Sequence, residues 1–134
     1  MTDLLDTNIC IDHLRRRGTH ALRRKLQVID PTEIAVCSVV VAELLAGCYP
    51  SQTRDACFKE VEELRQFFVS LPFDDAAAQH SGRVAADLES RGQRIGEADL
   101  FIAGVGIAND LTLLTNNIGE FSRVTGLRIE DWRA

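Results

Sequence analysis

The sequence predicts an α/β fold in which helices cover both faces of a short parallel sheet, a three-layer α/β/α sandwich. Its short apolar runs are rich in Val, Ile and Leu, as strands buried on both faces usually are. These runs alternate with longer segments of helical periodicity, which is typical of a parallel sheet. The 134 residues fit one compact unit, so we expect a single domain over residues 1–134.

The first half of the chain alternates between predicted strands and helices. The expected elements are a strand at residues 4–5, a basic helix-turn-helix over 9–28, a strand at 34–37, and helices over 38–47 and 53–68. Gly18 is the expected break in the helix-turn-helix. Ser38 is a suitable cap for the next helix, and Gly47 is a suitable residue just past its end.

The second half continues the alternation. The expected elements are an extended segment at residues 71–73, a helix from 74 or 75 to 90, a helix over 97–109, and strands at 112–115 and 127–129. Pro72 places the extended segment at a sheet edge, because proline lacks the N–H that a central strand needs. The segment 97–109 is almost wholly apolar, so we expect a buried helix with Asp99 as the only charge in its middle.

The charge balance argues against a protein that attracts nucleic acid by bulk charge. The formal net charge is −5, whereas such proteins are usually basic. A nucleic-acid substrate would therefore need local arginines and metal ions to offset its charge. Among the basic residues only Lys25 and Lys59 are lysine, and arginine suits bidentate contact with phosphate. A genome rich in arginine codons explains this equally well. Candidate RNA contacts, against the alternative of a solvated basic face, are Arg15, Arg16, Arg17, Arg91 and Arg94.

The cysteines predict neither a zinc site nor a redox motif. No two of the four have C-x-x-C spacing, so we expect all of them to be reduced. The first residues lack the pattern of a secretory signal, and no run approaches the ~20 apolar residues of a membrane span. We therefore expect a soluble cytoplasmic protein with no membrane contact.

Three acids follow predicted strands or begin a buried helix. Asp6 comes just after the first strand, Glu43 lies one turn into the helix after the second, and Asp99 is near the start of the apolar helix. In open α/β sheets, ligands bind beyond the carboxyl ends of the strands. We therefore expect these carboxylates to meet at one edge of the sheet.

Each acid also has an ordinary structural interpretation. Asp6 is a possible helix cap, Glu43 a possible solvent-facing residue, and Asp99 a possible first-turn acid favoured by the helix dipole. However, an ionised carboxylate among apolar residues costs several kcal/mol unless it is paired or binds a metal. Oxygen ligands select Mg²⁺ or Mn²⁺, and carboxylates around such ions promote phosphodiester hydrolysis by activated water, which Glu43 would orient or deprotonate.

Motifs for other chemistries are absent from the sequence. There is no G-x-x-x-x-G-K-[ST] loop, no G-x-G-x-x-G, no G-x-S-x-G and no histidine pair at metal-ligand spacing. A signalling receiver domain is also a small α/β fold with an acidic metal site. Its site requires a lysine after a late strand, and neither lysine of this chain is so placed.

Four motifs, in order along the chain, resemble the PIN domain. They are LLDTNI at 4–9, SVVVAELLAG at 38–47, GEADLFIAG at 96–104 and LTNNIGEF at 114–121. The ending GLRIEDW at 126–132 resembles the VapC toxins within that family. The resemblance implies an endoribonuclease that depends on Mg²⁺, with Mn²⁺ as a substitute, and that acts as the toxin of a VapBC toxin–antitoxin pair.

The resemblance also implies roles for individual residues. Asp6 and Asp99 match the metal-binding aspartates, and Glu43 matches the catalytic glutamate. Asn8 and Thr115 match polar residues that support the acids. The family often has a fourth acid where this chain has Asn117, which makes Glu120 a candidate substitute. This departure from the pattern keeps a catalytically weak, PIN-like RNA-binding module as the alternative.

The resemblance further implies partners. Toxins of this kind form homodimers, and the tail of a VapB-type antitoxin blocks the cleft in a larger heteromeric complex. That complex binds operator DNA through the antitoxin. The substrates of the family include structured RNAs, and the motifs at 114–121 and 126–132 resemble the subgroup that cleaves initiator tRNA.

Overall fold

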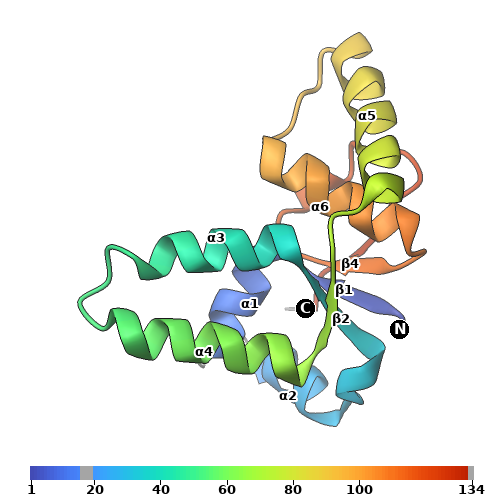
Figure 1. Cartoon of the computed structure of the whole chain (residues 1–134). Helices are drawn as coiled ribbons and strands as arrows, with labels where there is room; N and C mark the ends of the chain where they lie inside the picture. The colour runs from blue at the N-terminus through green and yellow to red at the C-terminus, as the bar shows by residue number, and fades with distance from the viewer. Residues whose placement is uncertain (16–19, 133–134) are drawn as a thin grey trace.

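A parallel sheet of five strands forms the centre of the molecule (Figure 1). The computed structural model describes residues 1–15 and 20–132. The strands are β1 (Asp3–Leu5), β2 (Ile34–Cys37), β3 (Val69–Leu71), β4 (Thr112–Leu114) and β5 (Arg128–Glu130). They lie in the order β3-β2-β1-β4-β5, and every neighbouring pair is parallel. The predicted α/β fold with a short parallel sheet is therefore confirmed.

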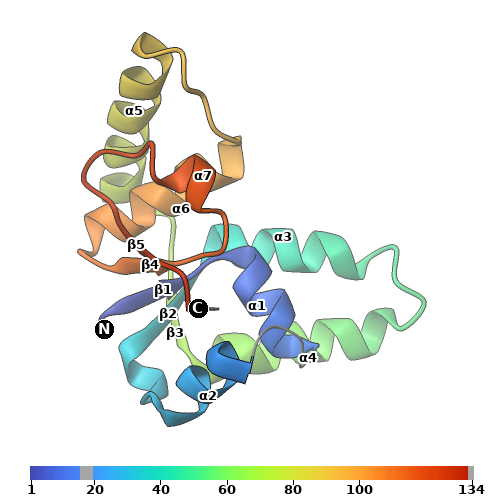
Figure 2. The same cartoon turned by 180° about the vertical axis from the view of Figure 1, so that it is seen from behind.

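Helices connect the strands and cover the sheet on both sides. They are α1 (Thr7–Leu14), α2 (His20–Val28), the 3₁₀ turn η1 (Pro31–Glu33), α3 (Ser38–Cys48), α4 (Arg54–Phe67), α5 (Asp75–Ser90), α6 (Glu97–Ala108) and α7 (Ile118–Phe121). From β1 to β3 the chain moves one way across the sheet, and from β3 to β5 it moves back. Right-handed crossovers then place α1–α4 on one side and α5–α7 on the other (Figures 1 and 2). In the described ranges, no helix has both the length and the apolar character of a membrane span.

The core lies where the sequence predicts it. β1 and β2 are buried along their whole length, as expected of central strands in a sandwich. α5 buries one stripe of side chains, namely Ala77, Ser81, Val84 and Leu88. This stripe packs against α6 at Gly104, where an added Cβ would overlap Ser81 Oγ and lie 2.6 Å from the carbonyl oxygen of Ala77. Only glycine permits this close approach of the two helices.

Several local predictions differ from the structure. Ser38 does not cap α3: it is the first helical residue, and its hydroxyl accepts a hydrogen bond from the N–H of Phe73 at 2.9 Å. Gly47 lies inside α3, which continues to Cys48. The short α7 was not predicted, because four residues are too few to show helical periodicity. The expected break at Gly18 lies outside the described residues.

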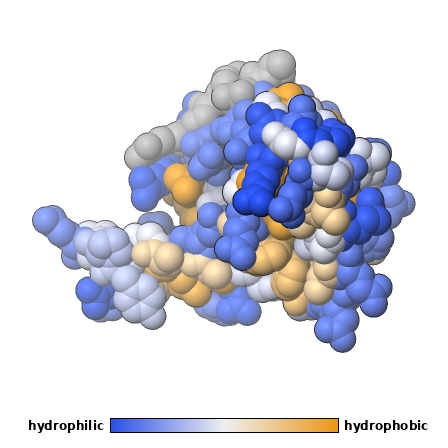
Figure 3. All heavy atoms as spheres, turned by 90° about the horizontal axis from the view of Figure 1, so that it is seen from above, coloured by the Kyte–Doolittle hydropathy of each residue, from blue (hydrophilic) through white to orange (hydrophobic). Residues whose placement is uncertain are grey.

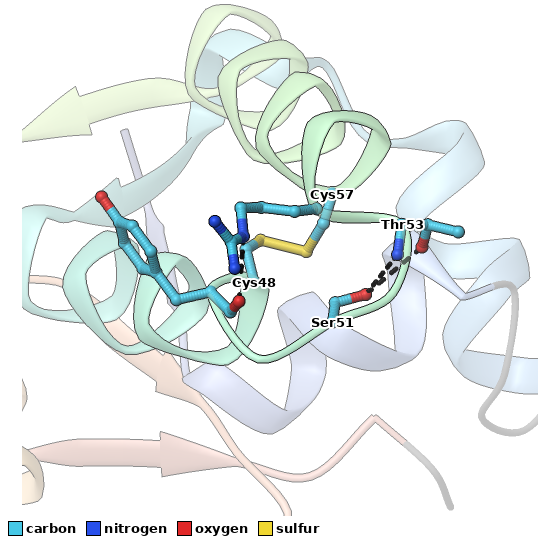
Figure 4. Close-up of a disulfide and its surroundings, with 6 residues drawn as sticks. Cys48, Ser51, Thr53 and Cys57 are labelled. Carbon is cyan, nitrogen blue, oxygen red and sulfur yellow. Dashed lines mark hydrogen bonds between the residues drawn. A yellow bond between two sulfur atoms is a disulfide. The ribbon is translucent and has the colours of Figure 1, made fainter.

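The prediction of four reduced cysteines is wrong. Cys48 at the end of α3 and Cys57 in the first turns of α4 form a disulfide, with their Cα atoms 5.4 Å apart (Figure 4). Cys10 and Cys37 are free and buried. The spacing of nine residues carries no local motif. The two cysteines meet because α4 folds back along α3.

The α3–α4 hairpin projects from the body of the molecule. Figure 3 shows it as an arm with a hydrophilic tip and apolar side chains along its length. At the turn, Ser51 Oγ accepts a hydrogen bond from the N–H of Thr53 at 3.1 Å (Figure 4). Tyr49 is 60% exposed and packs edge-on against Phe58. The disulfide and these local contacts together define the hairpin's tip.

Candidate active site

The order of the strands makes the carboxyl ends of β1 and β4 the place where a ligand crevice is expected. The chain leaves β1 toward β2 on one side, whereas β4 lies on its other side, so the connections diverge between these two strands. Ligands of open α/β sheets bind at such a switch point. Asp6 directly follows β1 and Thr115 directly follows β4, so both lie at this expected crevice.

Asp6 is buried and both of its carboxylate oxygens accept hydrogen bonds. Oδ1 accepts from the backbone N–H of Thr7 at 2.8 Å, and Oδ2 accepts from Thr115 Oγ1 at 2.7 Å. Asp6 is therefore also the N-cap of α1, as its ordinary interpretation predicts. Burial raises the pKa of Asp6, the two hydrogen bonds oppose this shift, and the charge of Glu43 adds to it. The hydrogen bonds thus hold the Asp6 carboxylate in place, although burial and the charge of Glu43 disfavour its ionised form.

Thr115 joins Asp6 to the loop that follows β4. It is fully buried, and its hydroxyl accepts a hydrogen bond from the N–H of Asn117 at 2.9 Å while it donates to Asp6. Thr115, predicted to support the acids, thus contacts Asp6 directly. Asn117 and the helix α7 that carries Glu120 are thus tied through Thr115 to the end of β1.

Asp99 and Glu120 form an interacting pair of carboxyl groups beside Asn117. The side-chain amide of Asn117 donates to Glu120 Oε2 at 3.0 Å and lies 3.5 Å from Asp99 Oδ2. Burial, the hydrogen bond with Glu120 and the charges of the other acids raise the pKa of Asp99 to about 7. The hydrogen bonds from Asn117 and Asp99 lower the pKa of Glu120. Burial thus disfavours the charged form of Asp99, whereas the hydrogen bonds favour the charged form of Glu120.

Glu43 reaches the site from α3 as an exposed residue. The buried face of α3 consists of Val40, Val41, Leu44 and Cys48, which leaves Glu43 facing solvent. Its carboxylate is nevertheless held, because Thr7 Oγ1 donates a hydrogen bond to Glu43 Oε1 at 2.6 Å. Glu43 also lines a groove of about 360 Å³ between α1, α3 and α4, together with Arg15 and Cys57. The buried apolar residues near Glu43 in the sequence thus lie on the other face of α3.

The structure brings most of the predicted site residues together. The charge of Glu43 raises the pKa of Asp6, and the charges of Asp6 and Glu43 raise that of Asp99, so the three acids interact. Asn8 differs: it is exposed on α1, and the hydrogen bonds of these acids within the described ranges do not involve it. Thr7 makes the contact instead. The sequence signal for Thr7 was its position directly after Asp6 at the start of a helix.

The donor set suits a hard cation. Carboxylate oxygens are the ligands that Mg²⁺ and Mn²⁺ prefer. Burial, together with repulsion from the other acids, raises the pKa of Asp99, and a bound cation would relieve that repulsion. Across residues 1–15 and 20–132, no three His, Cys, Asp or Glu side chains converge closely enough to form a ready-made cage. Mg²⁺ is usually held by one or two carboxylates with retained waters, so the residues present fit such an ion.

The arginines predicted as RNA contacts fall into two groups. Arg91 pairs with Asp87 at 2.7 Å, and Arg94 pairs with Glu89 at 2.8 Å, so their charges are partly balanced within the protein. Arg15 is exposed at the groove beside Glu43. The remaining candidates, Arg16 and Arg17, lie outside the described residues.

Comparison with known proteins identifies the family. Residues 4–127 match the family model described as PIN domain, so the chain belongs to the PIN domain family. It is 35% identical to the "tRNA(fMet)-specific endonuclease VapC" of Shigella flexneri and 35% identical to "Ribonuclease VapC2" of Haemophilus influenzae, each over 96% of both chains. A solved structure described as "DNA bound VapBC from Salmonella typhimurium" superposes with a TM-score of 0.91 at 31% identity, covering 98% of each chain.

These likenesses run over almost the full length and agree with one another. They confirm the predicted PIN-like sandwich and the resemblance to the VapC toxins. The chain is a VapC-type ribonuclease of the kind found in VapBC toxin–antitoxin systems.

Proposed function

We propose that this chain is a Mg²⁺-dependent endoribonuclease that hydrolyses RNA phosphodiester bonds at the crevice beyond β1 and β4. The observation that carries the proposal is the interacting set of acids, in which Asp99 has a pKa of about 7 because burial and neighbouring carboxylates disfavour its charge. A perturbed carboxyl group in a crevice is typical of a functional site. Mn²⁺, a hard cation of similar ligand preference, should substitute.

The acids have distinct proposed roles. Asp6 and Asp99 bind the ion, which when bound neutralises phosphate charge and activates water. Glu43 is exposed at the groove, so it can accept a proton from an attacking water. Thr115 holds Asp6 in place, and Asn117 holds Glu120 beside Asp99. Glu120 supplies the negative charge that Asn117 does not.

We propose a VapB-type antitoxin as the partner that neutralises the enzyme. The support is that solved relatives are described as VapBC complexes, two of them bound to DNA. This chain would then form a homodimer within a larger complex and reach operator DNA only through the antitoxin. Acting on cellular RNA places it in the cytoplasm.

A structured RNA is the proposed substrate, and tRNA is the first candidate. The Shigella flexneri relative that is described as tRNA(fMet)-specific is 35% identical to this chain. The net charge of −5 gives no general attraction for RNA. Recognition should therefore depend on local contacts, for which Arg15 at the groove is the best-placed described arginine.

The test is cleavage of purified tRNA and total RNA by the purified full chain with Mg²⁺, with Mn²⁺ and with a chelator. We expect cleavage that requires the ion and that is lost in Asp99→Asn. Cleavage that persists with the chelator would contradict the metal dependence. RNA binding by gel shift without any cleavage would instead support the alternative, a PIN-like RNA-binding module. Coexpression with a cognate VapB-type antitoxin should restore the growth of cells that express the toxin.

A further inference from the structure

Thr7 contacts two acids of the site with two different groups. Its backbone N–H donates to Asp6 Oδ1 at 2.8 Å, and its hydroxyl donates to Glu43 Oε1 at 2.6 Å. The second bond spans 36 residues of sequence and joins α1 to α3. Within the described residues, Thr7 is the hydrogen-bond donor to the Glu43 carboxylate.

The start of α1 explains this placement. Asp6 caps the helix, so Thr7 is its first residue. Side chains on a helix lean toward its N-terminus, and those of the first turn therefore point back toward the edge of the sheet. α3 starts directly after β2 at the same edge and brings Glu43 within reach. A distance of 2.6 Å is typical of a hydroxyl bonded to an ionised carboxylate.

Glu43 has reason to need such a contact. It is exposed, and a glutamate side chain has several freely rotating bonds that an exposed surface does not fix. The Asp6 carboxylate repels that of Glu43, and the Asp99 carboxylate does so once it has lost its proton. Without a donor, this repulsion would favour rotamers that turn Glu43 away from the crevice.

We propose that Thr7 is a positioning residue that holds the Glu43 carboxylate at the crevice through its hydroxyl, where Glu43 acts on the attacking water. This proposal rests on the proposed nuclease function. The two contacts of Thr7 are separable, because the bond to Asp6 uses the backbone and the bond to Glu43 uses the side chain.

Two substitutions isolate the hydroxyl. Thr7→Val keeps the size, the β-branch and the backbone N–H that caps the helix, but it removes the donor. Thr7→Ser keeps the donor. Thr32→Val is a matched control, since Thr32 Oγ1 donates to the Asp30 carboxylate at 2.9 Å at the opposite end of the sheet.

We expect Thr7→Val to lower kcat for RNA cleavage about 10- to 100-fold, with KM changed by no more than about twofold. Thr7→Ser should stay within about threefold of the wild type, and Thr32→Val should match it. Thr7→Val should add nothing to the loss caused by Glu43→Gln, because both changes act on one group. The proposal is overturned if Thr7→Val is as active as the wild type, if Thr7→Ser is as slow as Thr7→Val, or if the two losses multiply.

A second measurement needs no cleavage and no metal. Side-chain NMR couplings of Glu43 in the metal-free protein should report one dominant rotamer in the wild type and in Thr7→Ser, and averaging in Thr7→Val. Unchanged couplings in Thr7→Val would overturn the proposal. Wild-type protein that cleaves no RNA would contradict the nuclease function, while the couplings would still decide whether Thr7 positions Glu43.

Discussion

The acid site and the α3–α4 hairpin are stabilised in opposite ways. At the site, short hydrogen bonds such as that from Thr115 to Asp6 hold buried carboxylates whose charges repel one another. At the hairpin, a covalent bond between Cys48 and Cys57 closes an exposed turn. Glu43 lies on α3 and lines a groove with Cys57, so it belongs to both regions. The interactions at the site therefore favour reactivity at the expense of stability, whereas those at the hairpin favour stability alone.

The largest expected effect comes from removing an acid of the site. Asp6→Ala or Asp99→Asn should reduce RNA cleavage by about 10³-fold or more, because the ion loses a ligand. The fold should persist by circular dichroism. For Asp99→Asn we also expect a stability at pH 8 equal to or above that of the wild type, since the neutral amide avoids the repulsion that raises the pKa of Asp99. Full cleavage by either variant in Mg²⁺ would refute the assignment of the site.

The next effect is on pH dependence. Asp99 has a folded pKa of about 7 against an ordinary value of 3.8, so the folded state binds its proton more tightly than the unfolded state does. Asp99 therefore makes its full contribution to the free energy of unfolding below about pH 4, and this contribution is lost as the pH rises to about 7. Metal affinity has the opposite trend, because a cation binds the ionised form, and it should increase up to about pH 7.

Carbon-13 NMR of the Asp99 carboxyl group in the metal-free protein measures this directly. We expect a midpoint near pH 7, as the raised pKa implies. Glu120→Gln should lower that midpoint, because both the hydrogen bond with Glu120 and its charge raise the pKa of Asp99. A midpoint near the ordinary value of 3.8 would show that the acids do not interact as the structure indicates.

Sequence patterns predicted those features of the fold and site that depend on near neighbours. The buried strand at Ile34–Cys37 and the buried stripe of α5 follow from apolar periodicity alone. The position of Asp6 follows from the rule that ligands bind where parallel strands end, at one edge of the sheet. The contacts that were missed join residues far apart in sequence. Ser38 has the same local pattern whether it caps its own helix or bonds Phe73, 35 residues away. The partner of Thr7 is equally remote.

A smaller effect is expected on the number of ions that the protein binds. Asn117 stands where the family often has an acid, and its amide bonds Glu120 instead of binding a cation. We therefore expect one Mn²⁺ per chain to bind tightly in a calorimetric titration, with any second ion weak. Asn117→Asp should strengthen a second site. Two tightly bound ions in the wild-type protein would contradict the expectation that the site has less negative charge because Asn117 replaces an acid.

The smallest expected effect on cleavage comes from the hairpin, and it tests whether the two regions are coupled. The Cys48–Cys57 bridge joins residues nine positions apart in the sequence, and loss of such a constraint costs roughly 2–3 kcal/mol of unfolding free energy. Cys48→Ser/Cys57→Ser should therefore lower the midpoint of urea unfolding, and a thiol reductant should do the same to the wild type but not to the variant. Cleavage should change by less than about twofold, because Thr7 fixes Glu43 from α1 and not from the hairpin tip. A large loss of cleavage in the serine variant, with the fold intact at the assay temperature, would mean that the groove wall sets the position of Glu43. The site and the hairpin would then be one unit, and the separation between reactivity and stability would not hold.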